Sequence, residues 1–325
     1  MRLRVRIVSL AMATVSAGAV TACASTASPQ TPRFTLTPAA APSARTHAAA
    51  TPSASRPPSG PATGVTGAPK RVKAKGAVLA NAATGQVLWA RAPGTELPMA
   101  SVTKVMTALL VLQGGDLSRK IRVPKAAFSY AWKYGGETAS LRPGDTLTAR
   151  ELLAALLLPS GADAAYTLAN AYGPGLKVFV ARMNATAAQM GMTHTHFTSP
   201  DGLPYPTGTS TYSTPPDLIT LGRAAMRYAA FRSIVGQRFY HLPKGPGHHQ
   251  YWWYNTDYMI GTYPGAAGIK DGYTDKAGHC LLFEAARNGR TLIGAVLGSH
   301  ARGPAAAVKD AEQMLNWGFG LRRAG

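Results

Sequence analysis

Short apolar runs separated by turn residues lie in two regions of the chain, one near residue 80 and one between about residues 267 and 297. Residues 77–80 and 87–90 flank a glycine-containing turn, which predicts two paired strands. Near the carboxyl end, Asn288 and Gly289 form a hairpin signal between strand-like runs, so adjacent antiparallel strands are expected there. These runs cover residues 267–274, 278–285 and 291–297.

Between these two groups of strands, the apolar positions follow a helical pattern. A buried helix is expected to begin near Ser101 and to continue through residues 102–113, ending at a pair of glycines. Thr148 and Glu151 form a capping-box pattern ahead of a second helix, which Pro159 ends. Further helices are predicted at residues 162–171, 176–190, 214–228 and, after the last strand, 304–317.

Strands at both ends with helices between them predict a fold of the α/β (α+β) class. We expect one antiparallel sheet that is built from both ends of the chain and flanked by helices, with a helical lobe inserted into it. Residues 71–320 are expected to form this single domain, because their number is enough for one sizeable core.

The amino terminus has the features of an export signal. Three arginines precede the uncharged, apolar residues 7–20, a run too short for a transmembrane helix. The sequence from Val20 to Cys23 resembles a bacterial lipobox, so residues 1–22 are expected to be a lipoprotein signal peptide and Cys23 the lipid-modified first residue. An ordinary cleaved signal is the alternative. The prediction is an extracytoplasmic protein, lipid-anchored to the outer face of the bacterial cytoplasmic membrane.

Residues 23–70 are rich in Ala, Pro, Ser and Thr and contain hardly any large apolar side chain. Such a segment buries too little surface to offset the entropy of ordering, so a disordered tether is expected. The chain has two cysteines. Cys280, the one in the domain, lies in an apolar run and is expected to be a buried, unreactive thiol.

The chain carries a formal net charge of +20. A charge of this sign fits nucleic acid, but most basic residues are scattered and an exported chain rarely meets nucleic acid. We therefore expect no nucleic-acid partner and interpret the charge as a solvated surface that faces an anionic envelope.

Ser101 and Lys104 open the predicted buried helix with a spacing of three, which places the hydroxyl and the amine on one helical face. A serine becomes a good nucleophile only beside a base, and a lysine serves as that base only when it is neutral. Taken singly, the pattern is also that of an ordinary helix start with a solvated lysine.

Two more motifs follow in order along the chain. Ser160-Gly161-Ala162 stands at a predicted break between helices, and Lys270-Asp271-Gly272 lies on the first of the three carboxyl-terminal strands. The order of the three motifs resembles the serine β-lactamase and penicillin-binding-protein superfamily. Their surroundings resemble the low-molecular-mass D-alanyl-D-alanine carboxypeptidases, and the likeness covers nearly all of residues 76–300.

The resemblance implies catalysis through an acyl-enzyme. Ser101 would be the acylated nucleophile, Lys104 its base and Ser160 a proton relay toward the leaving D-alanine. The backbone amides of Ser101 and Tyr273 would stabilise the oxyanion. The implied partners are a peptidoglycan stem peptide ending in D-Ala-D-Ala and β-lactams, which would acylate the same serine. The residues expected to bind substrate are Lys270, Asp271, Gly272, Tyr273 and Thr274.

Two positions depart from the family pattern. Ala162 replaces the usual Asn of the second motif and offers no amide, and Asp271 replaces the usual Thr of the third. A carboxylate at 271 would repel the carboxylate of the substrate, and it is able to pair with Lys270. We therefore expect altered or weak carboxypeptidase activity, with transpeptidation, or an amidated or otherwise different substrate, as alternatives.

Two other functions stay open: a catalytically impaired wall-binding or regulatory protein that kept the fold, and a β-lactamase. Glu137 and Glu151 lack the local context of a deacylating glutamate, which disfavours the β-lactamase. No metal or other cofactor is expected, because the histidine pairs within residues 194–196 and 248–249 have no third ligand at motif spacing. The aromatic run 251–254 is interpreted as packing, with a sugar-binding surface as the alternative.

Overall fold

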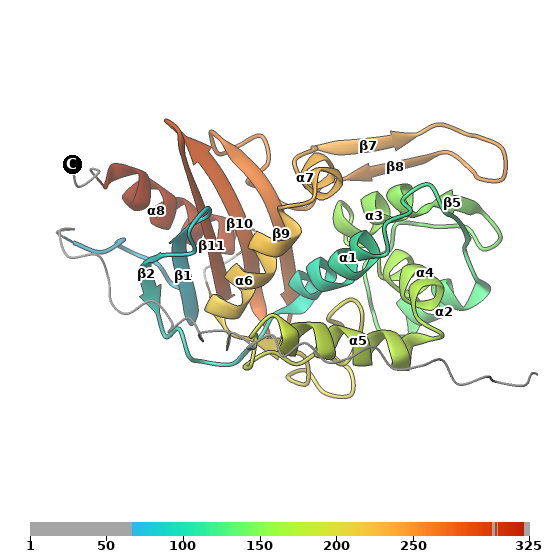
Figure 1. Ribbon diagram of the computed structural model, residues 1–325, viewed down its shortest axis with the longest axis horizontal. Helices are drawn as coiled ribbons and strands as arrows, with labels where there is room; N and C mark the ends of the chain where they lie inside the picture. The colour runs from blue at the N-terminus through green and yellow to red at the C-terminus, as the bar shows by residue number, and fades with distance from the viewer. Residues whose placement is uncertain (1–66, 301–302, 304, 322–325) are drawn as a thin grey trace, which may run out of the picture. The chain divides into compact units, whose positions relative to one another are not determined.

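The computed structural model describes residues 67–300, 303 and 305–321 (Figure 1). The predicted signal peptide, residues 1–22, and the predicted lipidation site Cys23 lie outside the described residues, as does nearly all of the predicted tether, 23–70. Within the described part of the chain, no helix is both long enough and apolar enough to cross a lipid bilayer.

Five antiparallel strands form the central sheet. The strand from the start of the folded part, β1 (Gly76–Asn81), pairs with the strand from its end, β11 (Arg290–Ser299). This pairing confirms the prediction of one sheet built from both ends of the chain. The other strands are β2 (Val87–Arg91), β9 (Ala266–Thr274) and β10 (Gly278–Arg287), and the order is β2-β1-β11-β10-β9, which makes β9 an edge strand.

Helices cover both faces of this sheet (Figure 1). On one face lies α8 (Ala306–Gly320), where Phe283 of β10 and Met314 share a buried apolar cluster. On the other face lies α6 (Pro215–Ala225), where a Cβ built on Gly222 would lie 3.2 Å from the side chain of Leu282, the residue before Phe283. Successive side chains of β10 thus point to opposite faces of the sheet, because side chains alternate between the two faces along a strand.

The middle of the chain forms the predicted helical lobe. It begins with a 3-10 turn, Ala100–Thr103, that continues directly into α1 (Lys104–Gln113), a helix buried along nearly its whole length. The predicted capping box of Thr148 and Glu151 is present at the start of α3 (Ala149–Leu157). The other helices of the lobe are α2 (Lys125–Lys133), α4 (Ala162–Tyr172) and α5 (Leu176–Gln189).

Some elements differ from the prediction. The helix predicted at residues 214–228 ends at Ala225, because Tyr228 is extended and precedes a separate helix, α7 (Ala229–Val235). Helix α2 has no predicted counterpart, since its only buried side chains are two alanines, which give a weak apolar pattern. The last helix begins at Ala306, and the proline at which its start is predicted, Pro304, lies outside the described residues.

Three pairs of short strands complete the fold, and none of them has a predicted counterpart. They are β3 (Leu97–Pro98) with β6 (Tyr212–Ser213), β4 (Lys120–Arg122) with β5 (Thr146–Thr148), and β7 (Phe239–Leu242) with β8 (Tyr251–Tyr254).

The β7–β8 hairpin divides the aromatic run between two faces. Tyr251 and Trp253 are buried, and the Trp253 indole N–H donates a hydrogen bond to the Ala139 carbonyl oxygen at 2.9 Å. Trp252 and Tyr254 are exposed. The interpretation of the run as packing is therefore right for the inner pair and does not apply to the outer pair.

Gly294 of β11 tests the packing of the sheet. A Cβ built there would stand 2.1 Å from the Cζ of Phe283. Gly294→Ala is therefore expected to lower the free energy of unfolding by about 1–3 kcal/mol, because a buried ring has to move. Gly94→Ala is the control, since nothing lies within 4 Å of its Cβ position. Chemical denaturation measures both, and a wild-type midpoint for Gly294→Ala would contradict this packing.

Candidate active site

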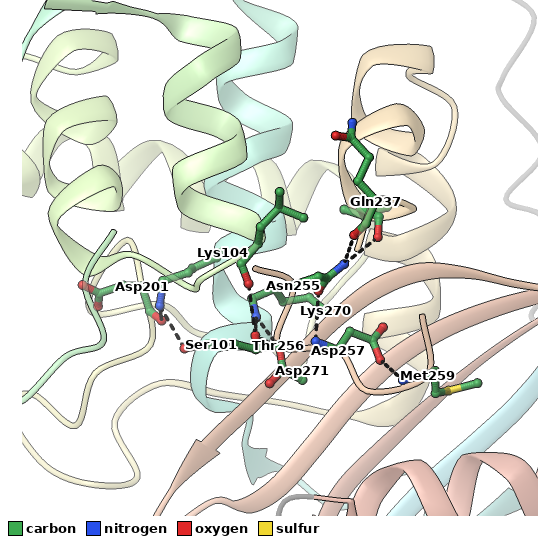
Figure 2. Close-up of polar contacts among 12 residues, drawn as sticks. Ser101, Lys104, Asp201, Gln237, Asn255, Thr256, Asp257, Met259, Lys270 and Asp271 are labelled. Atoms are coloured by element: carbon green, nitrogen blue, oxygen red, sulfur yellow. Dashed lines mark hydrogen bonds and ion pairs between the residues drawn. The ribbon is translucent and has the colours of Figure 1, made fainter. Parts of the chain in front are cut away.

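Ser101 and Lys104 meet at the start of the lobe's central helix. Ser101 lies in the 3-10 turn, and the Lys104 Nζ donates a hydrogen bond to the Ser101 Oγ at 2.9 Å. The same Nζ donates to the Asp201 backbone carbonyl at 3.1 Å, and Figure 2 shows all three residues together. Lys104 is only 1% exposed, so its amine is held in place against the hydroxyl, as the spacing of three predicts.

Burial lowers the pKa of Lys104 to about 8, because an ammonium ion is poorly solvated inside a protein. The charge of the Asp201 carboxylate opposes this shift, and the charge of Lys270 adds to it. An amine with this pKa is neutral in roughly one molecule in ten at pH 7, far more often than an ordinary lysine with a pKa of about 10.4. The neutral form is the one that can accept the Ser101 proton.

The edge strand β9 runs beside the nucleophile. A Cβ built on Gly272 would lie 2.7 Å from the backbone nitrogen of Ser101, so only a glycine allows this close approach. The next residue, Tyr273, has a 56% exposed side chain. The Thr274 hydroxyl stabilises the turn after β9 by accepting a hydrogen bond from the Ala277 N–H at 3.1 Å. The third motif therefore contacts the first through its backbone at Gly272.

Lys270 is buried and paired with the acid that follows it. Its Nζ lies 2.5 Å from the Oδ1 of Asp271 and 3.3 Å from the hydroxyl oxygen of Thr256 (Figure 2). The Thr256 hydroxyl lies 2.7 Å from the same carboxylate oxygen. Burial acts to raise the pKa of Asp271, but the charge of Lys270 and these hydrogen bonds outweigh it and hold the pKa below its usual value. Asp271 is therefore ionised at neutral pH, and the pairing considered from the sequence is present.

A second carboxyl group lies in the same neighbourhood. Asp257 is 2% exposed, and its Oδ1 accepts a hydrogen bond from the Met259 N–H at 2.9 Å. Its Oδ2 has no hydrogen-bond partner among the described residues. Burial, and after it the charge of Asp271, raises the pKa of Asp257 to about 7. Two acids thus lie near the single ammonium group of Lys270.

Ser160 follows α3 with a backbone φ of +63°, a region that residues with side chains rarely adopt. It is 5% exposed, and within the described residues its Oγ has no hydrogen-bond partner, so nothing there joins it directly to the other motif side chains. Its loop is tied to the third motif indirectly, because the backbone N–H of Thr256 donates to the Leu158 carbonyl at 3.0 Å.

The two residues after Gly161 are both buried, but one makes apolar contacts and the other accepts hydrogen bonds. Ala162, which departs from the motif pattern considered from the sequence, is fully buried and shares an apolar cluster with Leu203. Asp163 accepts hydrogen bonds from the N–H groups of Ala139 at 2.9 Å and Leu141 at 3.0 Å. Burial raises the pKa of Asp163 in spite of these bonds.

The motifs in the sequence identify four side chains of the site, but the contacts of three residues that surround them do not follow from those motifs. Asp201 supplies a backbone carbonyl to Lys104, and Thr256 and Asp257 flank the Lys270–Asp271 pair. The polar residues 255–257, which follow an aromatic run, give only a turn signal. No local pattern indicates that they face a strand more than ten residues away.

The remaining candidates from the sequence take no part in the hydrogen bonds described above. The His194 ring contacts Glu96 at 3.1 Å, and the His249 ring contacts Asp145 at 2.9 Å. Across the residues that are described, no three His, Cys, Asp or Glu side chains form a group able to hold a metal ion. Cys280 is 1% exposed, and burial raises the pKa of its thiol to about 12, so the prediction of a buried thiol is confirmed.

Comparison with known proteins gives a consistent result. Residues 63–301 match the family described as D-alanyl-D-alanine carboxypeptidase. A D-alanyl-D-alanine carboxypeptidase of Streptomyces sp. strain K15 is 37% identical over 273 residues, which are 80% of this chain and 91% of that protein. The D-alanyl-D-alanine carboxypeptidase DacB2 of Mycobacterium tuberculosis is 38% identical over 245 residues, 75% of this chain and 81% of that protein.

A solved structure supports the same relationship at the level of the fold. The crystal structure of the Streptomyces K15 DD-transpeptidase superimposes with a TM-score of 0.72 at 37% identity, covering 77% of this chain and 98% of that one. Its fold is that of the serine β-lactamase-like proteins, as the motif order predicts. This chain therefore belongs to the D-alanyl-D-alanine carboxypeptidase family of serine peptidases, with carboxypeptidase/transpeptidase function.

Proposed function

We propose that this chain acts on peptidoglycan stem peptides ending in D-Ala-D-Ala through an acyl-enzyme on Ser101. The neutral amine of Lys104 takes the Ser101 proton as the Oγ attacks the carbonyl carbon of the penultimate D-alanine. The peptide bond breaks, the terminal D-alanine leaves, and water or an amine then releases the acyl group. The observation that carries the proposal is the 2.9 Å contact between this serine and a buried lysine with a pKa of about 8.

Other motif residues are suited to supporting roles. The Ser160 hydroxyl, which has no partner among the described residues, is free to relay a proton to the leaving amine. The backbone N–H groups of Ser101 and Tyr273 are suited to hold the oxyanion, because Gly272 brings its strand against the Ser101 nitrogen. The charge of Lys270 helps to keep Lys104 neutral.

A second candidate is a catalytically impaired wall-binding protein of the same family. The observation that favours it is the ion pair of Lys270 with Asp271, because a paired ammonium group attracts a substrate carboxylate less strongly than a free one.

Labelling with fluorescent penicillin separates the two candidates. The enzyme is expected to become covalently labelled, and Ser101→Ala is expected to abolish the label, because among the described residues the Ser101 hydroxyl is the one side-chain group hydrogen-bonded to the Lys104 amine. Ser129→Ala, an exposed serine of α2, is the matched control and should label like wild type. A folded wild-type protein that takes no label would favour the impaired candidate.

The pKa of Lys104 predicts the pH dependence of acylation. The base is the neutral amine, so the rate of acylation by a penicillin should rise about tenfold per pH unit below pH 8 and level off above it. Stopped-flow measurement of penicillin acylation over this range tests the expectation. Lys104→Arg, whose side chain stays charged, should lower the rate at least about 100-fold. A flat profile in the wild type would exclude Lys104 as the base.

We also propose that the protein is exported and anchored to the outer face of the cytoplasmic membrane by lipid on Cys23, with residues 23–70 as a spacer. The lipobox-like sequence and the Pro-rich composition of the spacer support this proposal. Growth with a radiolabelled fatty acid should label the wild type and not Cys23→Ser, and Cys23→Ser should move from the membrane fraction to the medium. Equal fractionation of both proteins would rule out this anchor.

A further inference from the structure

A small pocket lies along the edge strand next to the nucleophile. It has a volume of about 210 Å³, and its walls include the rings of Tyr258, Tyr273 and His279. Asp271 and the backbone of Gly272 form part of the same lining, with Ala307 at the start of α8. We call it the β9 pocket. A Cβ built on Gly272 would lie 2.7 Å from the Ser101 nitrogen, so the edge strand that lines the pocket also runs past the reacting serine.

The charge of the β9 pocket comes from Asp271. The Asp271 side chain is 33% exposed, and its Oδ1 is held by Lys270 and Thr256. Its Oδ2 makes no hydrogen bond within the described residues, so that oxygen is available to a ligand. Among the residues that line the pocket in the described part of the chain, none is lysine or arginine. Burial lowers the pKa of His279, which disfavours the charged form of its ring.

This lining suits an uncharged or positively charged group and opposes a carboxylate. Lys270 and Asp271 form an ion pair, but Asp271 is the member of the pair that lines the pocket, and Lys270 is not part of the lining. Tyrosine rings attract cations through their faces, and an amide N–H can bond to the free carboxylate oxygen. A ligand carboxylate in the same place would instead meet the Asp271 charge at short range.

In acyl transfer, the amine that leaves and the amine that attacks occupy the same place, because each step is the reverse of the other. We propose that the β9 pocket binds this amine component, and that Asp271 makes it prefer components with an amide or ammonium group over those with a carboxylate. The inference rests on the proposed acyl-enzyme and extends it to the choice of acceptor.

Transfer to the acceptor forms one bond at the acyl carbon and breaks another. The neutral amine nitrogen attacks the acyl carbon, a C–N bond forms, the bond between that carbon and the Ser101 Oγ breaks, and one proton passes from the nitrogen to the Oγ by way of Lys104. The pocket would hold the group next to that amine, so it changes which acceptor competes best with water without entering the bond changes.

The preference between acceptors can be measured alone with a thioester donor whose leaving thiol is uncharged. Every acceptor then reacts with the same acyl-enzyme. D-alanine and D-alaninamide compete as acceptors, and the ratio of the two transfer products is measured by mass spectrometry. Because the two amines differ in basicity, the ratio is compared between wild type and Asp271→Asn. We expect Asp271→Asn to shift it toward D-alanine by at least about tenfold, the order expected from removing one nearby charge.

Asp271→Thr is a second variant with the same expected direction, and penicillin labelling shows that each variant keeps an intact serine site. Product ratios equal in wild type and variants, with acyl-enzyme formed in all, would overturn the inference and leave the proposed function in place. A wild type that forms no acyl-enzyme with the thioester would overturn both. Transfer in the wild type that already favours D-alanine over its amide, relative to the variants, would show that the pocket has the opposite preference.

Discussion

Burial of the Lys104 amine against the Ser101 hydroxyl is the interaction on which the rest of the site depends. An ammonium group inside a protein lacks the water that stabilises its charge, and so the amine loses its proton more easily. The packing of α1 among the leucines and alanines of the lobe supplies that burial. The Asp201 carbonyl then fixes where the amine lies. The apolar core of the lobe therefore sets the protonation state of the base.

The sheet contributes by bringing a second stretch of backbone to the same place. Pairing of β1 with β11 closes the sheet from both ends of the chain and leaves β9 at its edge, next to the start of α1. Gly272 permits backbone contact there, since any side chain would collide with the Ser101 nitrogen. The nucleophile thus lies between a helix that activates it and an open strand edge that is able to receive a peptide.

Charged groups lie close together beside this edge of the sheet. The charge of Lys270 lowers the pKa of Lys104, and the same ammonium group forms an ion pair with Asp271. Thr256 bridges the pair and also holds the loop before Ser160 through its backbone. In the proposed function, a substrate carboxylate has to compete with Asp271 for the Lys270 ammonium group. This competition links the departure of the third motif from the family pattern to the choice of substrate and acceptor.

The sequence by itself determined the strands at both ends, the main helices and the three motifs, because these follow from short-range periods, caps and spacings. The contact of Ser101 with Lys104 was among them, since three residues span one helical turn. Only the tertiary structure decided that Thr256 and Asp257 flank Lys270, that an Asp201 carbonyl meets Lys104, and that Asp271 faces a pocket. These contacts join segments far apart in the chain, and their distances follow from how the sheet and the lobe pack, which no local pattern of residues records.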